Sequence, residues 1–259
     1  MSTPPETNEF GIPLEVLALI DQLEHHVEKS PAVPLTHNRM VDEDAFYILT
    51  LRLKNALNQM GDKPERHTST VTHAVAVPHL PRLRRKETLL LIVDVQEKLM
   101  PVIHDSERVE ANCAVLAKAA RELHLPIVVT EQYPEKLGPT ANAVREAAGF
   151  PTAIGKLRFS ACTPQTLAAL ESSGRKTVLL CGVEAHVCML QTALDLREHG
   201  YQVFAARDAL SSRTPENAEI GWQRMQQAGV LPTSTESALF ELLEEAGTPE
   251  FKAILPLIK

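Results

Sequence analysis

The amino-acid sequence predicts a doubly wound α/β domain, in which helices cover both faces of a parallel sheet, with a small N-terminal helical hairpin before it. From Glu87 onward, short apolar segments alternate with longer segments that are apolar at helical spacing. The short segments are almost continuously apolar, as strands buried on both faces are. Asp94 and Cys188 each come at or just after the end of such a segment. In open α/β sheets, ligands bind outside the carboxyl ends of the strands. The same pattern therefore predicts where a functional site lies.

The first half of the domain contains three expected strands. Strand Leu89–Val95 begins with five aliphatic residues. The helix expected over Ser106–His124 has apolar residues three and four positions apart, which is the spacing of one helix face. Strand Ile127–Thr130, a short helix over Thr140–Ala148 and a weak strand near Thr152–Ile154 complete this half.

The second half begins with a helix that is marked at both ends. For the helix Pro164–Ser173, Thr163 is a suitable N-cap, proline stands at the first helical position and Gly174 lies beyond the last turn. The alternation then continues in the same manner, with the strands Thr177–Cys181, Tyr201–Ala205 and Val230–Thr233 and the helices Met189–Glu198, Glu216–Ala228 and Glu236–Ala246. Alternating strands and helices of this kind are typical of a parallel sheet.

The chain before residue 87 differs in texture. Only two of the 11 glycines precede that residue. Apolar residues at helical spacing in Pro13–Glu28 and after Asp42 predict a helical hairpin within residues 1–60, which is too small to hold a stable core alone. Residues 61–86 are polar without periodicity and are expected to be a linker, and residues 87–259 to be the main domain.

Bulk properties exclude several classes of partner. The formal net charge of −7 and an aromatic content of 4% argue against nucleic acid or an anionic membrane. The apolar stretch Leu89–Val93 is far too short to cross a bilayer, and the N-terminus lacks the apolar segment of a signal peptide. Four cysteines without a C-x-x-C pair indicate reduced thiols. We therefore expect a cytoplasmic protein.

Cys188 is the first candidate for chemistry, because it lies at an expected strand-to-helix turn. The N-terminus of a helix carries partial positive charge and unpaired backbone amides, which favour a thiolate and can bind an oxyanion. Asp94 and Lys156 are weaker candidates individually. The first could be a turn residue, the second a surface charge, and the cysteine itself a buried packing residue.

Together, three motifs resemble those of the isochorismatase-like cysteine hydrolases. They are the D-x-Q motif Asp94–Gln96, the lysine and F-S motif of Lys156–Ser160, and the turn Gly182–Cys188. The segments Thr130–Pro134 and Ala209–Arg213 are similar to the branch of isochorismatase domain-containing proteins. The resemblance covers about residues 87–258, and the motifs stand in the order of the family.

This resemblance implies roles for each residue. Asp94 would accept the thiol proton of Cys188 and later return it to the leaving group, and Lys156 would hold Asp94 ionised and stabilise the thiolate. The backbone amides of Glu184 and Cys188 would receive the oxyanion, beside a cis peptide between Val183 and Glu184. Attack by the thiolate would give an acyl-enzyme that water then hydrolyses.

Departures from relatives narrow the expected substrate. Nicotinamidases of this fold bind a metal through an aspartate-x-histidine motif, and the corresponding stretch here, from Thr130 to Glu135, has no histidine. We therefore expect no catalytic metal or other cofactor. A cysteine at position 188 favours a small amide or acyl substrate over isochorismate. Gln132 and Tyr133 could line the substrate pocket, or could belong to an ordinary polar loop.

Two other functions remain open from the sequence. The α/β domain could be a catalytically silent binding or scaffold module that is recruited through the N-terminal helices. Alternatively, a Cys188 with a lowered pKa could act as a redox sensor, since activated thiols oxidise readily. Proteins of this fold commonly associate, so a homo-oligomer is the expected assembly.

Overall fold

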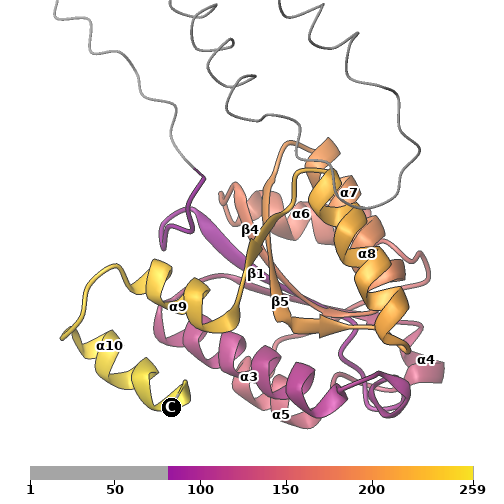
Figure 1. The fold of residues 1–259 in the computed structure, drawn as a ribbon, viewed down its shortest axis with the longest axis horizontal. Helices are drawn as coiled ribbons and strands as arrows, with labels where there is room; N and C mark the ends of the chain where they lie inside the picture. The colour runs from indigo at the N-terminus through magenta and orange to yellow at the C-terminus, as the bar shows by residue number, and fades with distance from the viewer. Residues whose placement is uncertain (1–80, 259) are drawn as a thin grey trace, which may run out of the picture. The chain divides into compact units, whose positions relative to one another are not determined.

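Six parallel strands form one sheet, in the order β3-β2-β1-β4-β5-β6 (Figure 1). The computed structural model describes residues 81–258. The chain runs outward from β1 to β3, returns to place β4 beside β1, and then runs outward in the other direction. The point of reversal lies between β1 and β4, where ligands bind in such sheets. The strands are β1 (Thr88–Val93), β2 (Ile127–Gln132), β3 (Ile154–Lys156), β4 (Thr177–Val183), β5 (Gln202–Ser211) and β6 (Leu231–Thr233).

Helices cover both faces of the sheet (Figure 1). One layer consists of α3 (Ser106–Glu122), α5 (Asn142–Ala147), α9 (Thr235–Leu243) and α10 (Pro249–Ile254). The opposite layer consists of α6 (Pro164–Ser172), α7 (Leu190–Glu198) and α8 (Pro215–Gln227). The shorter elements are α4 (Pro134–Leu137), 3-10 turns at Met100–Val102 and Leu255–Leu257, and a π-helical turn at Ala185–Met189.

The central strand β1 explains why its sequence is apolar without alternation. Leu90 and Ile92 belong to the hydrophobic cluster under one helix layer, while Leu89, Leu91 and Val93 belong to the cluster under the other. All five side chains are fully buried. Both faces of the strand thus require apolar residues, and each such side chain stabilises the fold by about 1.5–3 kcal/mol through burial.

The predicted fold class is confirmed, and most of the differences lie at element ends. Strand β1 ends at Val93, so Asp94 and Val95 lie beyond it. Strands β2 and β3 extend to Gln132 and Lys156, because these two residues pair across the sheet edge. The helical segment expected from Met189 begins earlier, at Ala185, as a π-helical turn. Helices α4 and α10 were not predicted, since each spans less than two turns.

The end of the predicted linker belongs to the core of the domain. Leu83 is fully buried, and its amide donates to the Glu241 carboxylate at 3.3 Å. The Arg85 guanidinium donates to the Leu123 carbonyl at 2.8 Å and to the Glu250 carboxylate at 3.1 Å. The hairpin predicted within residues 1–60, and the linker up to residue 80, lie outside the described residues.

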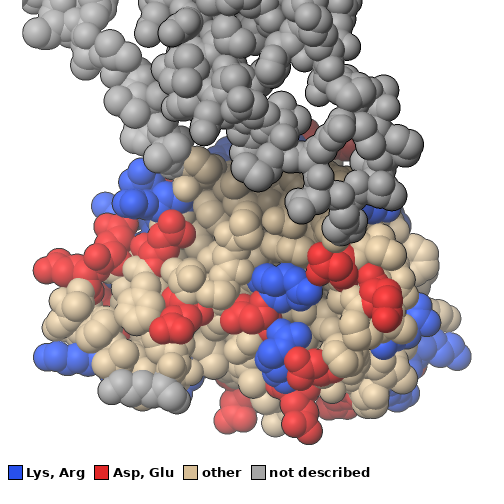
Figure 2. Space-filling view, in the orientation of Figure 1, with Lys and Arg blue, Asp and Glu red and all other residues tan. Residues whose placement is uncertain are grey.

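Two surface properties of the described region bear on partners. Within residues 81–258, no helix is both long enough and apolar enough to cross a membrane. Lysine and arginine side chains are interspersed with aspartate and glutamate over the face seen in Figure 2. That face therefore carries no broad field of a single sign.

Candidate active site

Asp94 lies at the reversal point of the sheet, directly after β1. Its backbone adopts a left-handed conformation, with φ of +55°, which aspartate tolerates better than most residues. Its amide still donates to the Thr130 carbonyl at 3.2 Å, so Asp94 stays bonded to β2 although it lies beyond the end of β1. The side chain is fully buried. One carboxylate oxygen, Oδ1, accepts a hydrogen bond from the Thr130 hydroxyl at 2.9 Å.

Lys156 is the last residue of the edge strand β3, two residues beyond the end of the strand expected near Thr152–Ile154. Its Nζ reaches the Oδ2 of Asp94 at 2.6 Å, and both side chains are fully shielded from solvent. Burying two charges costs several kcal/mol per ion, and their attraction offsets this only when the geometry is good. A gain in stability is therefore a weak explanation for this buried ion pair, and a chemical role is the better one.

The remaining partners of the Lys156 ammonium are neutral oxygens. The Gln132 Oε1 lies 2.7 Å from Nζ, and the Phe159 carbonyl oxygen lies at 2.9 Å. The Arg158 carbonyl is farther away, at 3.3 Å. The ammonium group thus has three N–H donors and four oxygen acceptors around it. Only the Asp94 carboxylate among these acceptors is charged.

Cys188 lies in the π-helical turn that follows β4. A cis peptide joins Val183 to Glu184 at the start of this turn, as the resemblance implied. Gly182 is required just before it, because it has φ of +125° and an added Cβ would lie 2.0 Å from the Val93 carbonyl oxygen. The Glu184 carbonyl accepts hydrogen bonds from the amides on either side of Cys188, those of Val187 and Met189. π-Helical turns occur frequently at functional sites.

The structure brings Cys188, Asp94 and Lys156 together. The Cys188 thiol lies close enough to both side chains for each of them to shift its pKa. Burial raises the pKa of Cys188 to about 12, the Asp94 carboxylate acts in the same direction, and Lys156 opposes them. The lowered pKa expected from a helix N-terminus is therefore wrong for the resting site, because desolvation and the neighbouring Asp94 carboxylate raise the pKa of the thiol.

The pKa of Asp94 is also raised, and burial is the largest cause. The charge of Lys156, the hydrogen bonds from Lys156 and Thr130, and the nearby Cys188 thiol act against this rise. A raised pKa makes the carboxylate a stronger base, so the same burial that keeps the thiol protonated improves the group that can take its proton.

Two residues that the sequence analysis missed hold the Cys188 turn in place. The Thr192 hydroxyl donates to the Cys188 carbonyl at 2.6 Å and accepts from the Ala161 amide at 2.8 Å. Gly221 of α8 touches the turn so closely that a Cβ atom would lie 2.6 Å from the Ala185 carbonyl. A signal existed for both, because Thr192 follows Cys188 by one helical turn and Gly221 interrupts a helical pattern.

Comparison with known proteins places the chain in a family. The isochorismatase domain family matches residues 88–237. The chain belongs to the isochorismatase family. The secreted isochorismatase effector Isc1 of Phytophthora sojae (strain P6497) is 40% identical over 71% of this chain and 90% of its own length. Isochorismatase domain-containing protein 2 of Danio rerio is 39% identical over 68% of this chain and 89% of its own.

A solved structure extends this similarity to three dimensions. The MAR1 ribonuclease of Caenorhabditis elegans is 36% identical, with a TM-score of 0.66, over 69% of this chain and 92% of its own. The family match over residues 88–237 contains Asp94, Lys156 and Cys188.

Gln132 and Tyr133 occupy different surroundings in this isochorismatase-family site. The Gln132 side chain is bound to Lys156 and to the Leu157 carbonyl. Tyr133 directly follows β2 in a left-handed conformation with φ of +41°, and 43% of it is exposed. It lines a hollow of about 600 Å³ with Lys136, Leu157 and others. A substrate-binding role for either residue stays a prediction.

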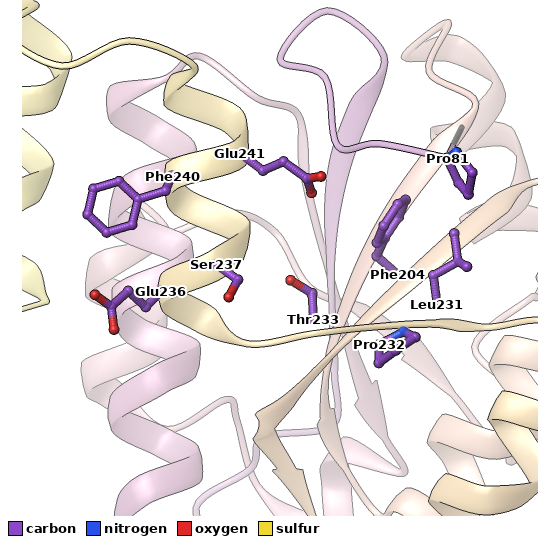
Figure 3. A pocket seen from close by; sticks show the side chains of 9 residues that line it. All are labelled: Pro81, Phe204, Leu231, Pro232, Thr233, Glu236, Ser237, Phe240 and Glu241. Carbon is purple, nitrogen blue, oxygen red and sulfur yellow. The ribbon is translucent and has the colours of Figure 1, made fainter. Parts of the chain in front are cut away.

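Two further observations bound the site of this isochorismatase-family domain. Within residues 81–258, no three histidine, cysteine, aspartate or glutamate side chains are grouped as metal ligands would be. A hollow of about 720 Å³ lies between α9 and the edge strand β6, and its lining contains none of the predicted site residues (Figure 3).

Proposed function

We propose that this chain is a metal-independent cysteine hydrolase that cleaves a small amide or acyl compound through an acyl-enzyme on Cys188. One observation carries the proposal. A buried thiol lies beside a carboxylate that is itself paired with a buried ammonium group, at the reversal point of the sheet. A nucleophile, a base and a compensating charge are the parts that covalent hydrolysis needs.

The first step is transfer of the Cys188 proton to Asp94. With a thiol pKa near 12, little thiolate exists at neutral pH, so the transfer is coupled to attack on the substrate. The net charge of the cluster does not change, because the negative charge moves from the Asp94 carboxylate to the sulfur. Lys156 lies within reach of both atoms and balances the charge in either position.

Attack forms a bond between the sulfur and the carbonyl carbon, and the carbonyl π electrons move to oxygen. The backbone amides of Glu184 and Cys188 are the proposed donors to this oxyanion. The intermediate collapses as the bond to the leaving group breaks, and Asp94 returns its proton to that group. Water then attacks the thioester, with Asp94 as base, and the departing sulfur recovers its proton.

A direct test uses small activated esters and anilides with intact-mass spectrometry. We expect a transient increase in mass equal to the acyl group, located on Cys188 by peptide mapping, together with release of the chromophore. The variant Cys188→Ala should lose both signals, while Cys162→Ala, which alters another buried cysteine, should keep them. Equal adduct formation in Cys188→Ala would overturn the proposal.

A ribonuclease activity is the second candidate, because the similar C. elegans structure is described as a ribonuclease. Net charge of −7 and the mixed charges in Figure 2 make a poor surface for a polyanion. We therefore expect no Cys188-dependent cleavage of single-stranded RNA. Cleavage that is lost in Cys188→Ala would favour the nuclease instead.

The location and assembly of the protein are also proposals. We infer that the protein is a cytoplasmic homo-oligomer. The alternative to a hydrolase is a catalytically silent scaffold that is recruited through the N-terminal helices. Light scattering on the full chain and on a variant lacking residues 1–80 tests the scaffold idea. If assembly and partner binding are unchanged without those residues, recruitment through the N-terminal helices is excluded.

A further inference from the structure

Gln132 has a side-chain amide that is occupied at both ends. Its Oε1 accepts from the Lys156 Nζ at 2.7 Å, and its Nε2 donates to the Leu157 carbonyl at 2.9 Å. Lys156 is the register partner of Gln132 on the neighbouring strand. These two bonds fix the orientation of the amide, although one N–H and one oxygen lone pair have no partner among them.

The backbone of Gln132 is clamped just as closely. The buried Gln96 side chain accepts from the Gln132 amide at 2.7 Å and donates to the Gln132 carbonyl at 3.0 Å. It also donates to the Gly138 carbonyl at 2.7 Å. Gln96 therefore fixes the end of β2, from which the Gln132 side chain reaches the lysine.

The Gln132 side chain that binds the ammonium group is neutral, and this matters to the chemistry. The Lys156 ammonium has one charged partner, Asp94, and is otherwise held by the neutral oxygens of Gln132 and Phe159. Neutral acceptors fix the ammonium group without adding a second negative charge. The single negative charge of the cluster can then move to Cys188 while the lysine stays in place, which avoids reorganisation during the reaction.

We propose that Gln132 is a positioning residue, which anchors the Lys156 ammonium beside Asp94 and Cys188. This inference rests on the proposed cysteine hydrolase function. It gives Gln132 a role that is exerted through the lysine and not through contact with substrate, so substrate recognition falls to other residues.

The test measures the rate at which acrylamide, a thiol reagent, labels Cys188 in the full chain, followed by mass spectrometry across a range of pH. Gln132→Met keeps the length of the side chain and removes both polar atoms. We expect labelling at about pH 8 to slow by about three- to tenfold, because a freer ammonium stabilises the thiolate less. Gln226→Met, at an exposed position of α8, should leave the rate unchanged.

A double-mutant cycle separates positioning from direct contact. In a Lys156→Met background, the effect of Gln132→Met should shrink to less than about twofold, since the group on which it acts is absent. An effect of the same size in both backgrounds would mean that Gln132 contacts the reagent itself and would overturn the inference. An unchanged rate in Gln132→Met alone would do the same. Lys156→Gln replaces Lys156→Met if the latter fails to fold.

A second variant tests whether the acceptor at position 132 must be uncharged. Gln132→Glu keeps an acceptor for Lys156 but adds a carboxylate, which opposes the thiolate. The labelling profile of Cys188 should move to higher pH by about one unit, and an unchanged or lower midpoint would contradict the charge argument.

The same data distinguish failure of the inference from failure of the proposed function. If Asp94→Asn and Lys156→Met both leave labelling of Cys188 unchanged, the cluster is not coupled to the thiol, and the cysteine hydrolase proposal fails. If those variants alter labelling but Gln132→Met does not, only the role of Gln132 is wrong.

Discussion

Gly221 of α8 lies against Ala185 with no space for a side chain between them. A Cβ atom on Gly221 would lie 2.6 Å from both the carbonyl carbon and the carbonyl oxygen of Ala185. Ala185 begins the π-helical turn that carries Cys188. The helix therefore supports the reactive turn through direct backbone contact, and the absence of a side chain sets how close the two can come.

The variant Gly221→Ala tests this contact, because two effects have opposite signs. Helix propensity alone predicts a gain of about 0.5–1 kcal/mol when alanine replaces glycine. Overpacking against backbone costs about 1–3 kcal/mol, and the backbone of the turn cannot yield as a flexible side chain would. We expect a net loss in the free energy of unfolding, measured with urea, together with slower acylation of Cys188. A more stable protein with normal acylation would show that the turn yields freely, and Gln226→Ala on the same helix is the control.

Thr192 joins the Cys188 turn to the loop that binds Lys156. Its hydroxyl connects the Cys188 carbonyl to the Ala161 amide, two residues after the Phe159 carbonyl that contacts the lysine. Thr192→Val keeps the shape and leaves both backbone groups without this partner, at about 1–3 kcal/mol for each buried group. Thr192→Ser keeps the hydroxyl and loses one methyl group, at about 0.8 kcal/mol.

The prediction concerns which of the two Thr192 variants loses more stability and more activity. We expect Thr192→Val to lower the free energy of unfolding more than Thr192→Ser, and to slow acylation of Cys188 more as well. Urea unfolding and the burst of chromophore release measure the two effects. If the serine variant is the more damaged one, packing of the methyl group dominates and the hydroxyl bridge is incidental.

The architecture could be predicted from the sequence because burial imposes a simple pattern. Strand β1 is buried on both faces, so five consecutive aliphatic residues identify it without other information. Thr163 likewise identifies the start of α6, where its hydroxyl accepts from the Thr166 amide at 3.2 Å. Periodicity cannot find α10, which is only six residues long.

The site was partly predictable for a different reason. Asp94 and Cys188 stand out because polar or reactive residues follow apolar strands, and parallel topology brings adjacent strand ends together. The Lys156 contact depends on the register between β2 and β3, which no local pattern specifies. The protonated state of Cys188 was missed because desolvation depends on the packed surroundings of the thiol and not on its neighbours in sequence.

The buried thiols make a prediction about stability in alkali. Burial raises the pKa of Cys162 to about 12, as it does for Cys188. Below about pH 9 the thiol is protonated in both the folded and the unfolded chain, so its stabilising contribution is complete. As the pH rises toward 12, the unfolded chain loses the proton first, and stability falls by about 1.4 kcal/mol per pH unit for each thiol.

Replacing one thiol isolates this contribution. In Cys162→Ala, the free energy of unfolding should fall less steeply between about pH 9 and pH 11, by about 1.4 kcal/mol per unit. Urea unfolding at several pH values gives the slope, and all other titrating groups are common to the two proteins. Parallel slopes would show that Cys162 ionises in the folded protein as readily as in the unfolded one.

Asp94→Asn should change labelling and catalysis in opposite directions. The carboxylate of Asp94 raises the pKa of Cys188, so its removal lowers that pKa and increases the thiolate fraction at a given pH. Acrylamide labelling of Cys188 at about pH 8 should therefore become faster. Hydrolysis should slow by about 10²–10⁴-fold, because the base and the proton donor to the leaving group are lost. Asp105→Asn, at the exposed start of α3, should alter neither rate. Slower labelling in Asp94→Asn would mean that the carboxylate promotes ionisation of the resting thiol, which is the reverse of the electrostatics of this buried site.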